Sequence, residues 1–375
     1  MSAAAHPSRA ATGTDLAVVI HGPGQVAIRE VPQTQGPVAV RTLFSGVSAG
    51  TELSFLTGTH PALNAAFDPE LGLFLPGRPG IGYPITRLGY MEVAQVETNS
   101  ADNGAGPPVD ALVAMTYGHR SGYRADPLTE RMIALPADLD PLLGIFVAHM
   151  GPICANGLLH AAAEICGPDV RSLSDGVAGR RVAVIGGGTV GLLTGLFAHH
   201  HGAREVVVID PTPQRRAAAE GLGLTALDPE DTDPAPLLKN RWRSGPGDRG
   251  ADVVFQCRGR AAALDLALRL LRPQATVIDL AFYTDNGTAL ALGAEFHHNG
   301  LGIRCAQIGR VPRGTTASWD RDRLSAETIT LLRHHATALR HHMITDVLPM
   351  AEGPTLLTDL AARRRHVIQA VLTPT

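Results

Sequence analysis

The stretch that most constrains the fold is RRVAVIGGGTVGLL, residues 180–193. Its Val and Ile residues predict a strand, its glycines a tight loop, and the apolar residues after the loop a helix. Gly186, Gly188 and Gly191 follow the spacing G-x-G-x-x-G. At this spacing the first glycine permits a sharp turn, the second lets the backbone approach a pyrophosphate, and the third lets the helix pack closely. The N–H groups at the helix start, near Thr189, then face the phosphates.

An acidic residue extends this pattern. Asp210 ends the next apolar run, 19 positions after Gly191, where about 20 is typical. A carboxylate there accepts both ribose hydroxyls of an adenosine and repels a 2′-phosphate, whereas Arg215 and Arg216 offer positive charge to such a phosphate. We therefore expect a nicotinamide dinucleotide, with NAD(H) favoured over NADP(H). A methyltransferase also carries a glycine loop and an acidic strand end, but it normally lacks the third glycine and a leading β-domain of this size.

The rest of the chain makes this unit part of the second of two domains. Short apolar runs broken by Gly and Pro predict a β-domain over residues 16–153. Strand–helix alternation with near-continuous Val and Ile runs predicts a parallel, doubly wound sheet over residues 154–308. Residues 309–375 return to the first domain, and residues 1–15 read as a disordered tail. The predicted fold class is therefore α/β, a β-domain plus a Rossmann domain.

Three local features are also predicted. Gly46, Gly50 and Thr51 indicate a tight turn after an apolar strand. Residues 57–83 are predicted to form a long loop, and we expect this loop to shape one wall of a substrate pocket. Residues 323–342 have the spacing of one amphipathic helix.

Composition excludes several classes of protein. The 375 residues carry a formal net charge of −3, which gives no reason to expect a nucleic-acid partner. Lys239 is the only lysine, so Schiff-base chemistry and tyrosine–lysine proton relays are disfavoured. The four cysteines form no C-x-x-C pair, and no apolar run approaches the roughly 18 residues of a membrane span. We expect a cytoplasmic protein that acts on a small molecule and has no membrane partner.

The motifs GVSAGTE, GGGTVG, GADVVFQCRG and LRPQATVIDLAFY occur in this order, and with them the chain resembles the medium-chain dehydrogenase/reductase family. The resemblance covers nearly the whole chain after the tail. It implies a GroES-like catalytic domain followed by a dinucleotide-binding domain, with cofactor contacts from Val190, Ala281 and Phe282. It also implies a homodimer paired through the edge strand near residues 303–308. SGVSAGTE, LGYMEVAQV and FHHNGLGIRCAQIG look most like the zinc-free branch around bacteriochlorophyllide dehydrogenases.

The chain departs from the zinc-binding members at each ligand position. Those members have a cysteine where Ser48 stands and a G-H-E element where this chain has Gly89-Tyr90-Met91. The third ligand, a cysteine or an acid, falls at Ile153, or at Cys154 if the register shifts by one. A catalytic zinc needs about three protein ligands, and the cysteine-rich lobe that holds a structural zinc is missing as well. We therefore expect no zinc.

Other groups then have to handle the proton. Hydride transfer without a metal needs a hydrogen-bond donor for the developing alkoxide or a base for the alcohol proton. The candidates are the hydroxyls of Ser48 and Thr51, the phenol of Tyr90 at the vacated histidine position, and the carboxylate of Glu52. Each has a structural alternative: Ser48 as a small filler, Thr51 and Glu52 as braces of the turn, and Tyr90 as a packed aromatic ring.

Further candidates lie later in the chain. His149, at the start of a predicted helix, suits a terminal proton acceptor because imidazole titrates near neutral pH, although a buried core histidine is the alternative. Asn156 could bind substrate or nicotinamide. Cys154 and His297 are candidates for the substrate pocket, and a helix end is the alternative for His297.

Three functions remain open from the sequence. The favoured one is a zinc-independent dehydrogenase that interconverts a secondary alcohol and a ketone on a specialised metabolite. The second is a zinc-free reductase of an activated C=C or C=N bond. The third is a redox-inactive dinucleotide-binding scaffold. The polar groups kept at Ser48, Thr51, Glu52 and Tyr90 argue against the scaffold, which has no need of them.

Overall fold

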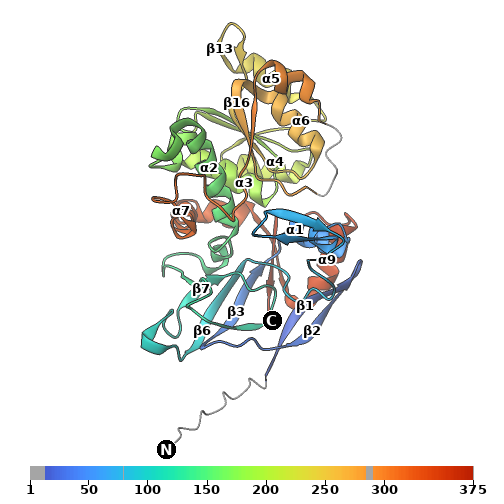
Figure 1. The fold of residues 1–375 in the computed structure, drawn as a ribbon, viewed down its shortest axis with the longest axis vertical. Coiled ribbons are helices and arrows are strands. Elements are labelled where there is room, and N and C mark those ends of the chain that lie inside the picture. The colour runs from blue at the N-terminus through green and yellow to red at the C-terminus, as the bar shows by residue number, and fades with distance from the viewer. Residues whose placement is uncertain (1–12, 79, 284–289, 375) are drawn as a thin grey trace, which may run out of the picture.

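The computed structural model describes residues 13–78, 80–283 and 290–374. These residues form a β-rich half and a second half built around a parallel sheet. Figure 1 shows the β-rich half below the half with the parallel sheet. The predicted α/β architecture is therefore confirmed. Of the predicted tail, residues 1–12 lie outside the described residues, and the first strand begins at Thr14.

The β-rich half contains a seven-stranded sheet in the order β18-β19-β3-β6-β7-β9, with β8 paired to β3, and a ribbon of β1 and β2. Because β19 pairs with β3, the end of the chain completes a sheet that its beginning starts. The strands are β1 (Thr14–Gly22), β2 (Gln25–Pro32), β3 (Val38–Gly46), β6 (Glu92–Asn99), β7 (Leu112–Met115), β8 (Gly122–Ala125), β9 (Ile133–Ala134), β18 (Ile344–Pro349) and β19 (Gln369–Thr373).

The other half is built on a parallel six-stranded sheet in the order β12-β11-β10-β15-β16-β17. Alternate residues of its strands enter different cores: Val182 and Val184 face one, Ala183 and Ile185 the other. Burial of both faces explains why these strands read as continuous apolar runs. The strands are β10 (Arg181–Ile185), β11 (Glu205–Ile209), β12 (Thr225–Leu227), β15 (Ala251–Gln256), β16 (Leu271–Asp279) and β17 (Gly302–Cys305).

Helices cover both faces of this sheet. One face carries α2 (Met150–Cys166), α3 (Thr189–His200), α4 (Pro213–Gly221), α7 (Arg321–His334) and α8 (Ala336–His342). The other face carries α5 (Pro234–Arg241) and α6 (Ala261–Leu270), with the short pair β13 (Arg243–Gly245) and β14 (Asp248–Arg249) at the far end. Helices α1 (Ala49–Leu56) and α9 (Gly353–Ala361) pack in the β-rich half. No helix of the described residues is long and apolar enough to cross a membrane.

Two predicted local features are wrong in part. The tight turn expected at Gly50 and Thr51 is the first turn of α1, which forms because Glu52 N donates to Ser48 O at 2.9 Å. The single helix expected over residues 323–342 is divided into α7 and α8 at His335, whose ψ of 18° is not helical. The ring of His335 bonds to α3, a tertiary contact that the helical spacing does not reveal.

The long loop expected over residues 57–83 contains a hairpin of β4 (Ala65–Asp68) and β5 (Leu73–Pro76). The Asp68 carboxylate accepts from the N–H groups of Glu70 and Leu71, and Gly72 follows with a φ of +67°, so the turn is locally specified. The strands show no polar–apolar alternation because neither of their faces is fully buried.

Candidate active site

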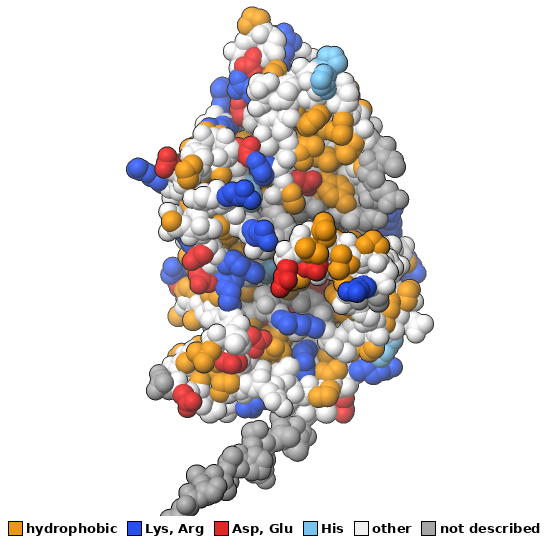
Figure 2. All heavy atoms as spheres, in the orientation of Figure 1, with side chains coloured by type: hydrophobic (Ala, Val, Ile, Leu, Met, Phe, Trp, Pro, Cys, Tyr) orange, Lys and Arg blue, Asp and Glu red, His pale blue; other side chains and the backbone are white. Residues whose placement is uncertain are grey.

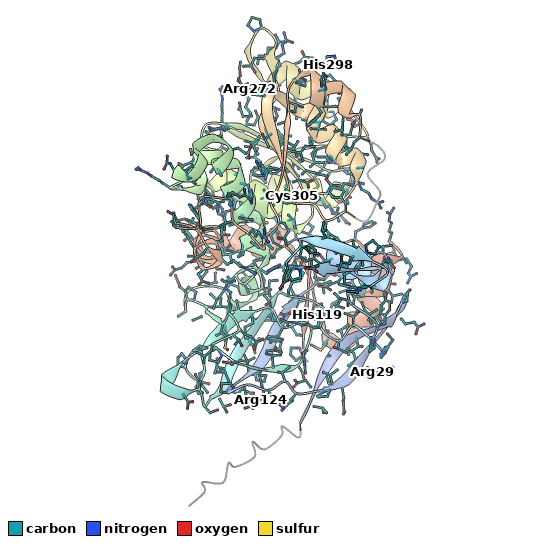
Figure 3. The ribbon with its side chains drawn as sticks, in the orientation of Figure 1. Arg29, His119, Arg124, Arg272, His298 and Cys305 are labelled. Carbon is teal, nitrogen blue, oxygen red and sulfur yellow. The ribbon has the colours of Figure 1, made fainter. Side chains whose placement is uncertain are left out.

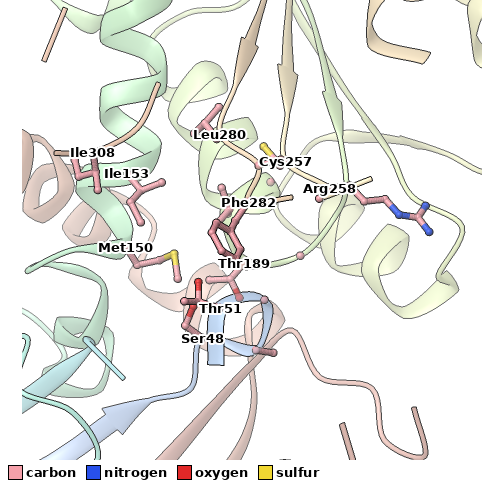
Figure 4. A pocket seen from close by; sticks show the side chains of 18 of the residues that line it. Ser48, Thr51, Met150, Ile153, Thr189, Cys257, Arg258, Leu280, Phe282 and Ile308 are labelled. Atoms are coloured by element: carbon pink, nitrogen blue, oxygen red, sulfur yellow. The ribbon is translucent and has the colours of Figure 1, made fainter. Parts of the chain in front are cut away.

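One cavity of about 500 Å³ lies between the two halves of the molecule (Figure 4). It opens at the carboxyl ends of β10, β15 and β16, on the side of the sheet where parallel α/β folds bind ligands. The starts of α1 and α2 form its opposite side. Predicted residues that line it are Ser48, Thr51, Tyr90, His149, Gly186, Gly188, Thr189, Val190, Gly191, Arg215, Ala281 and Phe282.

The glycine loop has the geometry that its spacing predicts. Gly186 has a φ of +98°, which favours glycine. A Cβ on Gly191 would lie 1.7 Å from the carbonyl oxygen of Gly186, so only glycine fits there. A Cβ on Gly188 would meet nothing within 4 Å, and Gly188 lines the cavity. The loop therefore leaves open space where α3 begins, which suits a pyrophosphate.

Asp210 directly follows β11, as predicted, but its carboxylate is buried and does not line the cavity. It accepts from Gly187 N and Thr212 N, both at 2.8 Å, and forms an ion pair with Arg215 at 3.5 Å. Asp210 thus fixes the glycine loop, and Arg215 partly balances its charge at the edge of the cavity.

Three hydroxyl groups meet at the opposite side of the cavity. The Ser48 hydroxyl and the Tyr90 phenol share a hydrogen bond, and Thr51 lines the cavity beside them. Burial raises the pKa of Tyr90, and the hydrogen bonds with Ser48 and Thr51 offset part of this increase. Tyr90 is therefore a neutral phenol near pH 7 and can donate a hydrogen bond into the cavity.

Behind these hydroxyls lies a buried network that holds the start of α1. The Glu52 carboxylate accepts from Ser48 N at 2.7 Å and lies 3.0 Å from His119 Nε2. His119 Nδ1 lies 2.7 Å from Ser45 Oγ, which donates to Glu92 at 3.0 Å. Burial alone lowers the pKa of His119, but the two carboxylates outweigh it and raise the pKa overall. Glu52 therefore braces Ser48 and lies outside the cavity, in an ion pair inside the β-rich half (Figure 3).

His149 lies at the N-cap of α2, with its ring 4.6 Å from the ring of Tyr90. Arg321 Nη2 donates to His149 Nδ1 at 2.7 Å. Since a guanidinium cannot accept, Nδ1 is the acceptor and the ring proton of neutral His149 lies on Nε2. Burial and the charges of Arg321 and Arg131 lower the pKa of His149 to about 4. This arrangement suits a hydrogen-bond donor and does not suit the proton acceptor expected from the sequence.

Known proteins resemble the chain in sequence and fold. A family model described as zinc-binding dehydrogenase matches residues 189–311. D-guloside 3-dehydrogenase of Escherichia coli K12 is 27% identical over 323 residues, which cover 84% of this chain and 87% of that protein. The 2-desacetyl-2-hydroxyethyl bacteriochlorophyllide A dehydrogenase of Cereibacter sphaeroides is 25% identical over 286 residues, 72% of this chain and 74% of that protein.

The chain is similar to the medium-chain zinc-type dehydrogenases over residues 189–311 and, at 27% identity, over most of its length. It is an NAD(P)-dependent dehydrogenase, so the scaffold hypothesis has no support. Among solved structures, a zinc-binding dehydrogenase of Sinorhizobium meliloti 1021 bound to NADP has the same fold, with a TM-score of 0.69 and 21% identity over 97% of this chain and all of that one.

The residues of this dehydrogenase do not fit a catalytic zinc ion at the three positions where zinc-binding dehydrogenases carry their ligands. Zinc in proteins takes Cys, His, Asp or Glu ligands, whereas Ser48, Tyr90 and Ile153 line the cavity there. The Cys154 thiol is buried and donates to Val190 O at 3.4 Å, away from the cavity. Among the residues that the structure describes, no three His, Cys, Asp or Glu side chains are grouped to hold a metal ion.

Asn156 and His297 lie outside the cavity of the dehydrogenase. The buried Asn156 amide donates to the carbonyl oxygens of Ala306, Gln307 and Arg310, at 3.2–3.4 Å, so it holds the loop that lines the cavity after β17. His297 is exposed just after the helical turn Leu292–Phe296, the helix end given above as its alternative. Its neighbour His298 lies at the far end of the sheet half (Figure 3).

Thr189 lines the cavity at the start of α3, and its side chain makes a further contact. Its hydroxyl donates to Ile368 O at 2.7 Å, so it ties the start of α3 to the β-rich half. Gln369 extends this contact, because it lies 3.3 Å from the Thr189 hydroxyl and donates to Val47 O at 3.0 Å. The glycine loop and the Ser48 bend are thereby joined through one buried glutamine.

Sequence reasoning missed several residues at this site. His119, Glu92, Arg321 and Gln369 act through partners distant in the chain, so no local spacing marks them. Asp279 is different, because it directly precedes the cavity loop at the end of β16 and an acid at such a strand end is a recognisable signal. Burial raises its pKa, and it accepts from Ala281 N and the Tyr283 hydroxyl.

Proposed function

We propose that this dehydrogenase interconverts a secondary alcohol and a ketone with NAD(P)(H) and without zinc, on a specialised metabolite. The observation that carries the proposal is the set of hydroxyls from Ser48, Thr51 and Tyr90 that shares one cavity with the glycine loop. Two relatives are named as dehydrogenases of a D-guloside and of a 2-desacetyl-2-hydroxyethyl bacteriochlorophyllide, and both substrate names describe hydroxyl-bearing compounds, which favours alcohol chemistry over reduction of a C=C or C=N bond.

Ketone reduction requires a hydride and a proton. The bound nicotinamide supplies the hydride, or accepts it in the reverse direction. Tyr90 is a neutral phenol, so it can donate its proton to the oxygen that becomes the alcohol, and the Ser48 hydroxyl stabilises the resulting phenolate. His149 Nε2–H and the Thr51 hydroxyl supply further hydrogen bonds to that oxygen, which is the role of preorganised donors.

We propose NAD(H) as the preferred cofactor, with NADP(H) as the alternative. The Asp210 carboxylate after β11 disfavours a 2′-phosphate, and its ion pair with Arg215 weakens that effect. The dissociation constants of NADH and NADPH, measured by the fluorescence of bound cofactor, decide between them.

We also propose a homodimer in the cytoplasm. The edge position of β17 in the six-stranded sheet supports pairing between two copies. The four cysteines are free thiols, as is usual in a reducing compartment.

The proposal is tested with Tyr90→Phe and Thr51→Ala in a spectrophotometric assay of NADH oxidation by ketones. We expect Tyr90→Phe to lower kcat by roughly 10²-fold, because general acid catalysis contributes about 10²–10⁴-fold, while the affinity for NADH stays unchanged. The matched control is Tyr123→Phe, whose hydroxyl bonds to Glu130 away from the cavity. Full activity in both Tyr90→Phe and Thr51→Ala would refute the proton assignment, and stoichiometric zinc with loss of activity on chelation would refute the metal-free reaction.

A further inference from the structure

The cavity wall around the hydroxyl cluster is apolar. Met150, Ile153, Leu280, Phe282 and Ile308 line it, as Figure 4 shows. Among the described residues that line the α1–α2 side, the hydrogen-bonding side chains are those already assigned to the reacting oxygen or to its proton donor. A substrate group that enters beside α1 and α2 therefore meets polar side chains at the hydroxyl cluster and mainly apolar side chains around it.

The charged side chains of the lining do not alter this character. Arg215 and Arg258 lie beside the glycine loop, since a Cβ on Gly187 or Gly186 would approach their Cβ atoms to 3.2 and 3.1 Å. In Figure 4 the Arg258 side chain points away from Ser48 and Thr51. The Asp279 carboxylate already accepts hydrogen bonds from Ala281 N and the Tyr283 hydroxyl.

An aromatic stack continues the apolar wall to the molecular surface. Phe282 lines the cavity and is 43% exposed. The ring of His60 lies 5.2 Å from the ring of Phe282 and 4.0 Å from that of Phe55, stacked with both. His60 is followed by the turn Pro61–Leu63 and then by the hairpin β4–β5. The hairpin is thus attached directly to the rim of the cavity.

The hairpin carries large apolar side chains in water. Phe67 and Phe74 are cross-strand partners with ring centroids 5.2 Å apart, and they are 52% and 51% exposed. Leu71 and Leu73, at the turn, are also exposed. The hairpin lies beside α1 where the two halves meet in Figure 1, and Figure 2 shows hydrophobic side chains gathered there beside acidic ones. Exposed apolar patches of this kind mark binding surfaces.

We infer that the substrate is an alcohol or ketone attached to a large, apolar, ring-shaped frame, and that the hairpin β4–β5 holds this frame outside the cavity. The inference rests on the function proposed above. The cavity of about 500 Å³ also contains the glycine loop, so the dinucleotide takes up part of it and a small oxygen-bearing group fits in the rest. A polyol would leave hydroxyl groups without partners against Met150 and Ile153, a loss that strongly selects against such substrates.

The test compares three secondary alcohols with NAD⁺ as oxidant: 1-(2-naphthyl)ethanol, 2-butanol and D-sorbitol. We expect kcat/KM for the naphthyl alcohol to exceed that for 2-butanol by at least about tenfold and that for sorbitol by more. Phe67→Ser combined with Phe74→Ser should lower kcat/KM for the naphthyl alcohol by about tenfold, through KM, and leave 2-butanol unchanged. Leu128→Ser, at a residue 82% exposed elsewhere on the surface, is the matched control and should change neither.

The outcomes separate this inference from the proposed function. Faster turnover of sorbitol than of the naphthyl alcohol would overturn the apolar substrate and leave the alcohol–ketone reaction standing. NADH binding without turnover of any of the three alcohols, or of their ketones, would count against the proposed function itself. If the double variant keeps its preference for the naphthyl alcohol and instead loses self-association in size-exclusion chromatography, the hairpin is an interface between copies and the inference fails.

Discussion

His149 shows how burial and neighbouring charges together decide the chemistry of a side chain. The sequence marks it as a titratable group near a cavity, and imidazole would ordinarily change charge close to neutral pH. In the folded chain Arg321 occupies its Nδ1 atom, and burial with two guanidinium groups lowers its pKa to about 4. The same residue is thereby a fixed donor at Nε2 over the whole physiological range.

Arg321→Met should raise the pKa of His149. Removing a positive charge 2.7 Å from the ring makes protonation less unfavourable, while the burial that is the larger cause of the lowered pKa remains. The pKa should therefore move only part of the way back to about 6.5. NMR titration of labelled histidine measures it directly. Arg323→Met is the matched control, because Arg323 belongs to the same helix as Arg321 but lies over the ring of Trp319. It should leave the pKa of His149 unchanged.

At the scale of elements, the strand–loop–helix unit around the glycine loop separates two roles of glycine. Gly188→Ala should leave the fold intact, since its Cβ meets nothing within 4 Å, but the methyl group would enter the cavity that the dinucleotide needs. We expect thermal unfolding close to that of the wild type and a Kd for NADH raised by roughly tenfold, a cost of about 1.4 kcal/mol.

Gly191→Ala should show the opposite pattern. Its Cβ would lie 1.7 Å from Gly186 O, a backbone atom that cannot move without the loop, so the apo protein itself should be destabilised by about 1–3 kcal/mol or more. Differential scanning calorimetry without cofactor separates the two variants. Equal melting of both would contradict the division of roles.

How far the sequence predicts each element depends on what specifies it. The glycine loop, β10, β11 and α3 follow from local spacing, because parallel strands buried on both faces and a phosphate-binding turn need those residues within one short stretch. The hairpin β4–β5 escapes prediction because both its faces are partly in water and its apolar residues have no period. The break at His335 and the brace from Glu52 to His119 depend on partners more than 60 positions away, which no window of sequence contains.

At the scale of the whole molecule, histidines gather where the end of α3 meets the joint between α7 and α8. His200 Nδ1 lies 3.2 Å from His335 Nε2, and its ring lies 5.0 Å from that of His334 and 5.2 Å from that of His201. Burial and the neighbouring imidazoles lower the pKa of His200, His201 and His335, to about 4 for His201. The packed state of these helices therefore favours the neutral form of these imidazole rings.

Acid should weaken this junction in a defined window. Below the unfolded-state pKa of about 6.5, the unfolded chain takes up protons that the folded rings refuse, so the free energy of unfolding falls as pH decreases toward about 4. The stability that the neutral histidines contribute is fully present above a pH of about 6.5 and is lost progressively as the pH falls toward about 4. His149 and His160, whose pKa values are also lowered by burial, act in the same direction, whereas the raised pKa of His119 acts against it.

A comparison of variants isolates the junction from these other histidines. His200→Gln combined with His201→Gln removes two of the histidines whose protonation the fold disfavours. The free energy of unfolding of this double variant, measured with urea, should therefore fall less between pH 7.5 and pH 5 than that of the wild type. His298→Gln, at an exposed residue outside the junction, should keep the wild-type slope. If the double variant shows the full wild-type loss, protonation elsewhere governs acid stability, and the helices at this junction pack independently of the charge on their histidines.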